Sequence, residues 1–320
     1  MRLFIRKLLY IGGMLLLISL ISFLAIHAAP NSFFAAGQLN PNITKEAIEH
    51  LKAVYGLDKP LWEQYLRWVW AMLHLDFGLS FASGKPVIDE IAGRLPITLS
   101  MNIISMIFVF FISLRIGVKA ALKRHTLYDR GVKQAALLSF AMPSFYLALI
   151  LILLFGLKLG WFPISGLQSI DPKTGWMKWV DYAWHLAIPI FVMVFGGFGG
   201  LAMYVRSLSL EILKSDYIFF AKARGIDEVT IKRRFIMPNL MPSIVTILGL
   251  SLPGLIGGSV IIESIFSING MGLLFYQSAL SRDYPVIMGI LIITAFLTLL
   301  GNVLADLALL KLNPYAKREV

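Results

Sequence analysis

The sequence contains no cysteine and few charged residues. The lack of cysteine excludes disulfide bonds and thiolate metal sites. Charged residues make up 15% of the 320 residues, against roughly 25% in ordinary soluble domains, and the mean hydropathy of +0.77 is too high for a soluble fold. A net charge of +11 would indicate nucleic acid for a soluble protein. Here it is better explained by positive charge retained beside a membrane, so we expect a bilayer and no nucleic acid as the surroundings.

The sequence also lacks the short motifs of common catalytic sites. No Gly-x-x-x-x-Gly-Lys-Ser/Thr segment is present, so the chain cannot bind ATP through a P-loop. Neither a His-Glu-x-x-His helix nor a Gly-x-Ser-x-Gly elbow occurs. The five histidines stand far apart, without the spacing of metal ligands: His27, His50, His74, His125 and His185. We therefore expect no catalytic residue, no metal site and no cofactor bound by this chain.

Six apolar runs are long enough to cross a bilayer as helices. They cover residues 8–29, 97–117, 135–157, 186–204, 244–266 and 286–309. The first run is expected to be an uncleaved anchor, because its apolar body of some 22 residues exceeds the roughly 7–15 of a signal peptide. The predicted fold is an all-α integral membrane protein with six transmembrane helices and a long outer loop after the first helix.

The distribution of Lys and Arg orients these helices. With a cytoplasmic N-terminus, the cytoplasmic segments hold 19 Lys or Arg, counting Arg115 at the end of the second run, and the short outer segments hold 4. The long outer stretch 30–96 is largely exempt from the positive-inside rule. The predicted topology therefore places both termini in the cytoplasm.

The outer stretch has two local helix signals. Thr44 is a fair N-cap, and Gly56 follows the expected last turn of a first helix. Pro60 suits the first turn of a second helix. The second helix is rich in apolar and aromatic residues: Trp62, Tyr65, Leu66, Trp68, Val69, Trp70 and Leu73. It either lies at the membrane interface or forms a docking or gating element over the outer mouth.

Ionisable residues within or beside the apolar runs are costly. Arg115, Lys119 and Arg206 lie at cytoplasmic helix ends, where we expect their long side chains to reach the lipid headgroups. Glu263 lies deeper. It either faces a pathway through the bundle or, as we favour, pins the following turn by accepting backbone hydrogen bonds. For Asp306 we favour local capping or an inter-helix contact.

Small residues gather where helices would approach closely. Two clusters stand out: Gly196, Gly197, Gly199 and Gly200 in the fourth run, and Gly254, Gly257 and Gly258 in the fifth. With Glu263, we take Gly196, Gly197, Gly257 and Gly258 as candidates for helix packing or for lining a pathway. Three prolines are expected to kink or start their helices: Pro143, Pro189 and Pro253.

The segment Glu211–Pro242 separates two apolar runs and has the composition of a soluble helix. It carries six Lys or Arg between positions 214 and 234. Connections between membrane helices are usually only a few residues long. A basic, helical connection of this length indicates a docking surface on the cytoplasmic side.

This segment resembles the cytoplasmic coupling loop of permease subunits of bacterial ABC importers. That loop has an alanine-rich turn, then a glycine, then a basic helix that ends in Asn and Pro. The coupling candidates in this sequence are Tyr217, Ala221, Ala223, Arg224, Gly225, Asn239 and Pro242. The sequence departs from the pattern at Phe235 and Pro238, where the family usually has His and Arg, and at Asn313, where it usually has Asp before Pro314.

Other segments resemble the oligopeptide, dipeptide and nickel branch of that family. They are Tyr55–Pro60, Asp76–Ser80, Gly258–Glu263, Asn269–Gly272 and Ser281–Pro285. Within the branch, the runs most similar to the Yej-type permease of peptide and microcin C uptake are Asp181–His185, Gly196–Phe198 and Ser281–Pro285.

The resemblance implies a type I ABC-importer permease fold in the bacterial inner membrane. Its partners would be a second homologous permease, two cytoplasmic ABC ATPase subunits and an extracytoplasmic solute-binding protein. ATP and Mg²⁺ would be bound by the ATPase subunits, so this chain would be no enzyme. The short helix around Ala221–Gly225 would sit in a groove on an ATPase and pass its motion to the bundle. Residues 1–96 would form an anchor and outer loop, and residues 97–320 a core with the coupling loop 211–242.

The cargo stays open at this point. A peptide or a peptide-like antibiotic is the first expectation, and a nickel chelate or another small solute is the alternative, because the binding protein sets much of the choice. An ion-gradient secondary transporter would usually place charged or unwound sites near the middle of the membrane. This chain mostly lacks them.

Overall fold

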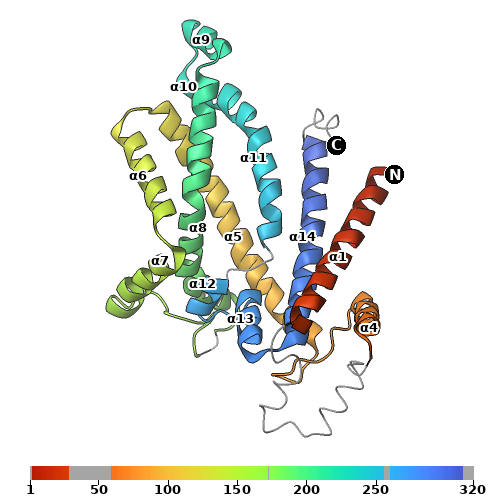
Figure 1. Ribbon diagram of the computed structural model, residues 1–320. Coiled ribbons are helices and arrows are strands. Elements are labelled where there is room, and N and C mark those ends of the chain that lie inside the picture. The colour runs from red at the N-terminus through yellow and green to blue at the C-terminus, as the bar shows by residue number, and fades with distance from the viewer. Residues whose placement is uncertain (1, 29–58, 172, 256–259, 313–320) are drawn as a thin grey trace. The chain divides into compact units, whose positions relative to one another are not determined.

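The computed structural model describes residues 2–28, 59–171, 173–255 and 260–312 (Figure 1). Within these ranges the regular structure is helical apart from one isolated bridge between Leu79 and Pro86. The helices are α1 (Arg2–Ala28), α4 (Leu61–Leu73), α5 (Val87–Leu122), α6 (Leu127–Ala141), α7 (Ser144–Leu151), the π-helical η1 (Ile152–Lys158), α8 (Trp176–Leu213), α9 (Asp216–Ala223), α10 (Glu228–Ile231), the π-helical η2 (Lys232–Ile236), α11 (Met237–Ser251), the 3-10 helix η3 (Leu252–Leu255), α12 (Val260–Ile265), α13 (Met271–Ser281) and α14 (Tyr284–Leu312).

The long apolar helices confirm an all-α integral membrane fold. Among the described residues, four are long and apolar enough to cross a bilayer: Val87–Leu122, Trp176–Leu213, Glu228–Ser251 and Tyr284–Leu304. The pair Leu127–Ala141 and Ser144–Lys158 is apolar and long enough as a whole but bent, as in a broken span or a re-entrant loop, and α1 contains the shorter apolar helix Leu9–Ala25. The number six and the orientation stay predictions. The outer helix predicted at Pro60 is present as α4, whereas the one predicted after Thr44 lies outside the described residues.

Two predicted runs are not single helices. The run 135–157 breaks at Pro143, and the two helix axes differ by 102° there. Proline has no N–H to donate and suits a helix start, so it ends α6 and begins α7. The α-helix in the run 244–266 ends at Ser251, and Pro253 lies in the 3-10 turn that follows. Pro189, in contrast, lies inside α8 without ending it.

The chain divides into two compact units. The first comprises Met1–Thr98, Ile256–Ser264 and Asn269–Val303, and the second comprises Leu99–Leu255, Ile265–Ile268 and Leu304–Val320. The core of the first unit is built by buried residues of α4, α5, α13 and α14 and of the α4–α5 connection: Met72, Phe77, Val87, Ile91, Met271, Leu274, Val286, Ile290 and Ile292. The division predicted at residue 96 stays a prediction.

Two sequence segments that carry the family resemblance meet in the first unit. Asp283, only 1% exposed, accepts a hydrogen bond from the Ser80 hydroxyl at 2.6 Å. Its carboxylate also accepts from the backbone N–H groups of Phe81 and Ala82, both at 3.1 Å. The run Asp76–Ser80 is thereby joined to the run Ser281–Pro285, which explains why an acidic side chain is tolerated in an apolar interior.

Glu263 has the structural arrangement favoured from sequence. It is fully buried, and its carboxylate accepts from the Thr98 hydroxyl and from the backbone N–H of Leu273, both at 2.9 Å. The Thr98 hydroxyl in turn accepts from the N–H of Met271 at 2.8 Å. These bonds satisfy N–H groups in the first turn of α13, which have no partner within the helix itself.

The second unit packs α6 closely against α8. Gly199 of α8 lies where a methyl group would come within 2.7 Å of the Ala136 carbonyl oxygen and 2.8 Å of the Ser139 hydroxyl. Its backbone N–H donates to that hydroxyl at 3.2 Å. A methyl group at Gly197 would touch Val109 at 3.0 Å, whereas one at Gly196 would meet no other atom within 4 Å. Of these two glycines chosen from sequence, only Gly197 has a neighbour in the place that a side chain would take.

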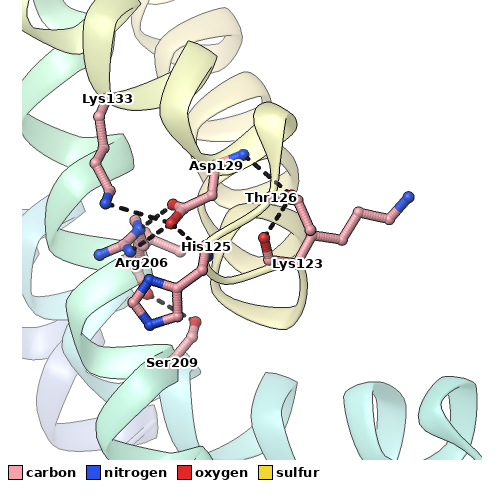
Figure 2. Close-up of polar contacts among 8 residues, drawn as sticks. Lys123, His125, Thr126, Asp129, Lys133, Arg206 and Ser209 are labelled. Carbon is pink, nitrogen blue, oxygen red and sulfur yellow. Dashed lines mark hydrogen bonds and ion pairs between the residues drawn. The ribbon is translucent and has the colours of Figure 1, made fainter.

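A buried ion pair joins the same two helices (Figure 2). Asp129 of α6 is fully buried and Arg206 of α8 is 8% exposed. The guanidinium donates through Nε at 2.6 Å and through a terminal nitrogen at 2.9 Å. The N–H of His125 and the ammonium of Lys133 also approach this carboxylate, at 3.1 Å and 3.4 Å. The prediction that Arg206 reaches the headgroups is therefore wrong, because its charge is neutralised inside the chain.

Replacing Gly199 by Val should destabilise the α6–α8 contact by about 1–3 kcal/mol, because the added methyl groups overlap backbone and side-chain atoms of α6. Gly196→Val in the same helix is the matched control, since no atom lies within 4 Å of its first added carbon. The measurement is thermal unfolding of the detergent-solubilised protein. Equal loss in both variants would contradict the packing role of Gly199.

Asp129→Ala should destabilise the protein by about 3–5 kcal/mol, because it leaves the buried Arg206 charge unpaired. The double variant Asp129→Leu with Arg206→Met removes both charges and should regain most of the loss. The same thermal unfolding measurement compares the two. A double variant as unstable as the single one would show that the charges themselves are not the cause.

Candidate coupling site

The coupling segment begins directly after the long helix α8. The Ser215 hydroxyl donates to the Ile212 carbonyl at 2.6 Å, and α9 starts at the next residue. Figure 1 shows α9 just beyond the end of α8. Ile218 and Ala221 are the buried residues of α9. Ile218 belongs to an apolar cluster with residues of α5, α8, α10, η2 and α11: Val118, Val205, Ile212, Ile231, Ile236, Leu240 and Ile244. The helix is therefore firmly seated on the ends of long helices.

The other side of α9 is apolar and exposed. Tyr217, Phe219 and Phe220 are 45%, 69% and 62% exposed. Ala223 and Arg224 at the end of the helix are exposed as well. Buried Ile218 and Ala221 are three residues apart, as one helical face requires, so the exposed aromatic rings belong to the remaining surface. Neighbouring phenylalanines in contact with water are characteristic of an interaction surface.

Gly225 ends α9 through its backbone conformation. Its φ is +77°, the left-handed region that favours glycine. The N–H of Gly225 donates to the Lys222 carbonyl at 2.9 Å, and the N–H of Ile226 donates to the Ala221 carbonyl at 3.2 Å. This pair of bonds is a Schellman motif. The first carbon of a side chain at Gly225 would meet no other atom within 4 Å. Conformation, rather than lack of space within the chain, accounts for the glycine.

The chain then re-enters a helix at once. Asp227 caps α10 by accepting from the Thr230 N–H at 3.1 Å. Hydrogen bonds from the Thr230 side chain and backbone lower the pKa of the exposed Asp227 carboxyl. The cap is thus charged at neutral pH, which favours the N-terminus of a helix.

The second half of the segment runs into the next membrane helix. Phe235, at a position where the sequence departs from the family pattern, stacks on Tyr217 with ring centroids 6.2 Å apart. The side-chain amide of Asn239 donates to the Phe235 carbonyl at 2.7 Å. The π-helical turn η2 ends two residues before Pro238, which lies in the first turn of α11 and has no N–H for the regular ladder. Pro242 lies inside α11.

The structure brings the seven coupling candidates together only in part. Ala221 is buried, whereas Tyr217, Ala223, Arg224 and Gly225 are exposed around α9. Asn239 and Pro242 are exposed further along, on α11. Phe219 and Phe220 were not selected from the sequence, although two adjacent aromatic residues in a basic, helical segment are a recognisable signal.

The pathway candidates are less well placed. Gly257 and Gly258 lie outside the described residues, as does the side chain of Asp306. Glu263 is occupied by the hydrogen bonds that hold the start of α13. Among the described residues, the contacts of these candidates therefore do not direct a polar group at a pathway.

Comparison with known families gives two matches that together cover nearly the whole chain. Residues 113–318 match the family described as binding-protein-dependent transport system inner membrane component. Residues 1–102 match the N-terminal family of the same transport-system membrane components.

Individual relatives are similar over almost their full length. The oligopeptide transport system permease protein AppB of Bacillus subtilis is 36% identical over 311 residues, 97% of either chain. The dipeptide transport system permease protein DppB of Escherichia coli is 31% identical, with 94% of either chain covered. Among solved structures, an inward-facing form of the MetNI methionine ABC transporter contains a chain of similar fold, with a TM-score of 0.51 and 20% identity. The similarity covers 69% of this chain and 97% of that one.

Proposed function

Since the chain belongs to the family of binding-protein-dependent transport system inner membrane components, we propose that it forms part of the pathway by which an ATP-driven importer carries peptides across the inner membrane. A second permease subunit would complete the pathway. An extracytoplasmic binding protein would deliver the cargo, and two cytoplasmic ATPase subunits would bind ATP and Mg²⁺. This chain is the transport subunit and not the enzyme.

Similarity to peptide permeases supports a peptide cargo. The single observation that carries it is 36% identity to an oligopeptide permease over 97% of both chains. A dipeptide permease is similar over nearly the same length. Nickel chelates and other small solutes are the alternative, and no contact in the described residues favours them.

The Yej-type subtype is the finer part of the proposal. One run behind it, Asp181–His185, holds an outer loop: Asp181 accepts from the N–H and hydroxyl of Ser169, at 2.7 Å and 2.5 Å. The His185 ring nitrogen Nδ1 is hydrogen-bonded to the Asp181 carbonyl at 2.8 Å. These residues line a pocket of about 460 Å³ with Phe162 and Trp184. In this proposal the run shapes the outer surface of the permease.

The geometry of α9 supports its role as the contact with an ATPase. Its exposed Phe219 and Phe220 supply the surface that a groove on the ATPase would cover. Its buried Ile218 packs with residues of α5, α8 and α11, so a displacement of α9 would be passed on to those helices. A pocket of about 300 Å³ beside α9, lined by Lys222, Glu228 and apolar side chains, gives this region a further recess for a partner.

Cargo can be tested with the assembled transporter in liposomes, with its partner permease, ATPases and binding protein. We expect ATP-dependent uptake of labelled oligopeptides, which an excess of unlabelled peptide abolishes. Transporter with a hydrolysis-deficient ATPase is the control. Uptake of nickel without peptide would overturn the peptide assignment, and gradient-driven uptake by this chain alone would favour a secondary transporter.

Gly225→Val should lower ATP-driven uptake while the protein still inserts into the membrane. A β-branched residue at positive φ is strained by roughly 1–2 kcal/mol or more, so the turn after α9 would shift. Gly225→Asn is the matched control, because Asn tolerates this conformation. We measure uptake and ATP hydrolysis in the same liposomes.

The three possible results separate the reasons for glycine at this position. Loss in Val alone confirms the conformational role, and equal loss in Val and Asn shows that the partner leaves no room for a side chain. Undiminished uptake in both variants would count against coupling through this turn.

A further inference from the structure

Helix α4 is held against the middle and outer part of α1. The Tyr65 hydroxyl donates to the Leu16 carbonyl at 3.2 Å and lies 2.8 Å from the Ser19 hydroxyl. The ring of Phe23 meets the rings of Tyr65 and Trp68 at centroid distances of 5.4 Å and 6.1 Å. Ser19 and Phe23 are buried. Figure 1 shows the two helices next to each other.

These contacts place α4 at the depth of the hydrocarbon. Basic residues stand at the start of α1, and its apolar stretch covers Leu9–Ala25. With a rise of about 1.5 Å per residue, Phe23 and Ser19 lie roughly 3 Å and 9 Å before Ala25, the last residue of that stretch. The hydrocarbon core is about 30 Å thick, so both positions fall inside it. Phe23 also packs with Tyr284, the first residue of α14, which places the contact toward the same end of a second membrane helix.

Three sides of α4 have three different surroundings. Gln64 and Met72 are buried, and Trp68 is partly buried against the core. A second side is exposed and apolar, and we call it the α4 stripe: Trp62, Leu66, Trp70 and Leu73, which are 65%, 57%, 67% and 68% exposed. A third side carries the pair Glu63–Arg67, with its nitrogen and oxygen 2.8 Å apart.

Helix α1 also has an exposed apolar surface, on the side of the helix next to the residues that contact α4. It consists of Leu17, Leu20, Ile21 and Leu24, whose side chains are between 39% and 58% exposed. They stand at the same height as Ser19 and Phe23 along the helix axis. An apolar side chain exposed at this depth of a membrane helix meets acyl chains when no protein covers it. Because α4 packs against α1 at this depth, its exposed stripe is open to the same environment.

We propose that α4 is a membrane-embedded helix whose stripe contacts the acyl chains of one leaflet, while Glu63 and Arg67 face the headgroups and water. The two tryptophans of the stripe, Trp62 and Trp70, fit this location, since their rings favour the boundary between apolar and polar regions. The ion pair next to the stripe supplies the polar side that an interfacial helix needs. The assignment concerns how the outer segment is anchored, and it holds whatever the transporter carries.

The absence of cysteine makes site-directed spin labelling direct. Leu66→Cys places a nitroxide on the stripe, and Arg67→Cys places one on the neighbouring polar side, at nearly the same depth. The full chain, assembled with its partner subunits, is reconstituted into bilayers of phosphatidylethanolamine and phosphatidylglycerol. Collision with oxygen, which concentrates in acyl chains, is compared with collision with a water-soluble nickel complex.

We expect the ratio of oxygen to nickel collisions to be several-fold higher at position 66 than at position 67. A Leu73→Cys label should behave like the one at 66, and it replaces that variant if Leu66→Cys folds poorly. Equal ratios at 66 and 67 would overturn the proposal, because the stripe would then face water. A label at 66 that is immobile and shielded from both reagents would also overturn it, because a protein partner would then cover the stripe.

Discussion

A carboxylate buried in an apolar bundle must have its hydrogen bonds satisfied, and this constraint fixes several helix ends of the molecule. Asp129 is matched by a guanidinium, Asp283 by a hydroxyl and two N–H groups, and Glu263 by a hydroxyl and one N–H. Each acid joins segments that are far apart in sequence. Because an unpaired charge would be costly in this environment, each of the three contacts allows little variation in how its segments meet.

Packing and hydrogen bonds likewise hold the coupling segment in place. Ile218 packs with residues from several long helices, while the Schellman turn at Gly225 and the cap at Asp227 hold the two ends of the connection. A surface that transmits force must not yield within its own support. The stacking of Phe235 on Tyr217 adds support at a position where the family usually has a polar residue.

Hydropathy predicted the class of fold and the approximate runs, since about twenty apolar residues in sequence report directly on a membrane helix. It did not predict the break at Pro143 as a 102° bend, because the angle depends on what the two halves pack against. The start of α5 was missed by ten residues, since Val87–Pro96 carries charges that hydropathy excludes. Arg206 was misplaced for a related reason: its partner Asp129 lies 77 residues away, beyond any local pattern.

The candidate site was partly readable from the sequence. The coupling segment stood out by its charge and length, and its glycine by the family pattern, but the reason for the glycine needed the backbone angle at Gly225. Spacing alone could not show that an added methyl group would contact Val109 at Gly197 but no other atom at Gly196. A small residue permits another helix to approach closely, but the sequence does not show which of several small residues a helix lies against.

The exposed rings of Phe219 and Phe220 also bear on how the subunit is made. Until a partner covers them, two adjacent exposed aromatic side chains at the tip of a basic loop favour nonspecific association. We expect the subunit that covers this surface to be synthesised together with this chain, because an excess of the membrane chain would be prone to aggregation or degradation. The surface proposed to contact the ATPase would then also limit how much of this chain accumulates without its partner.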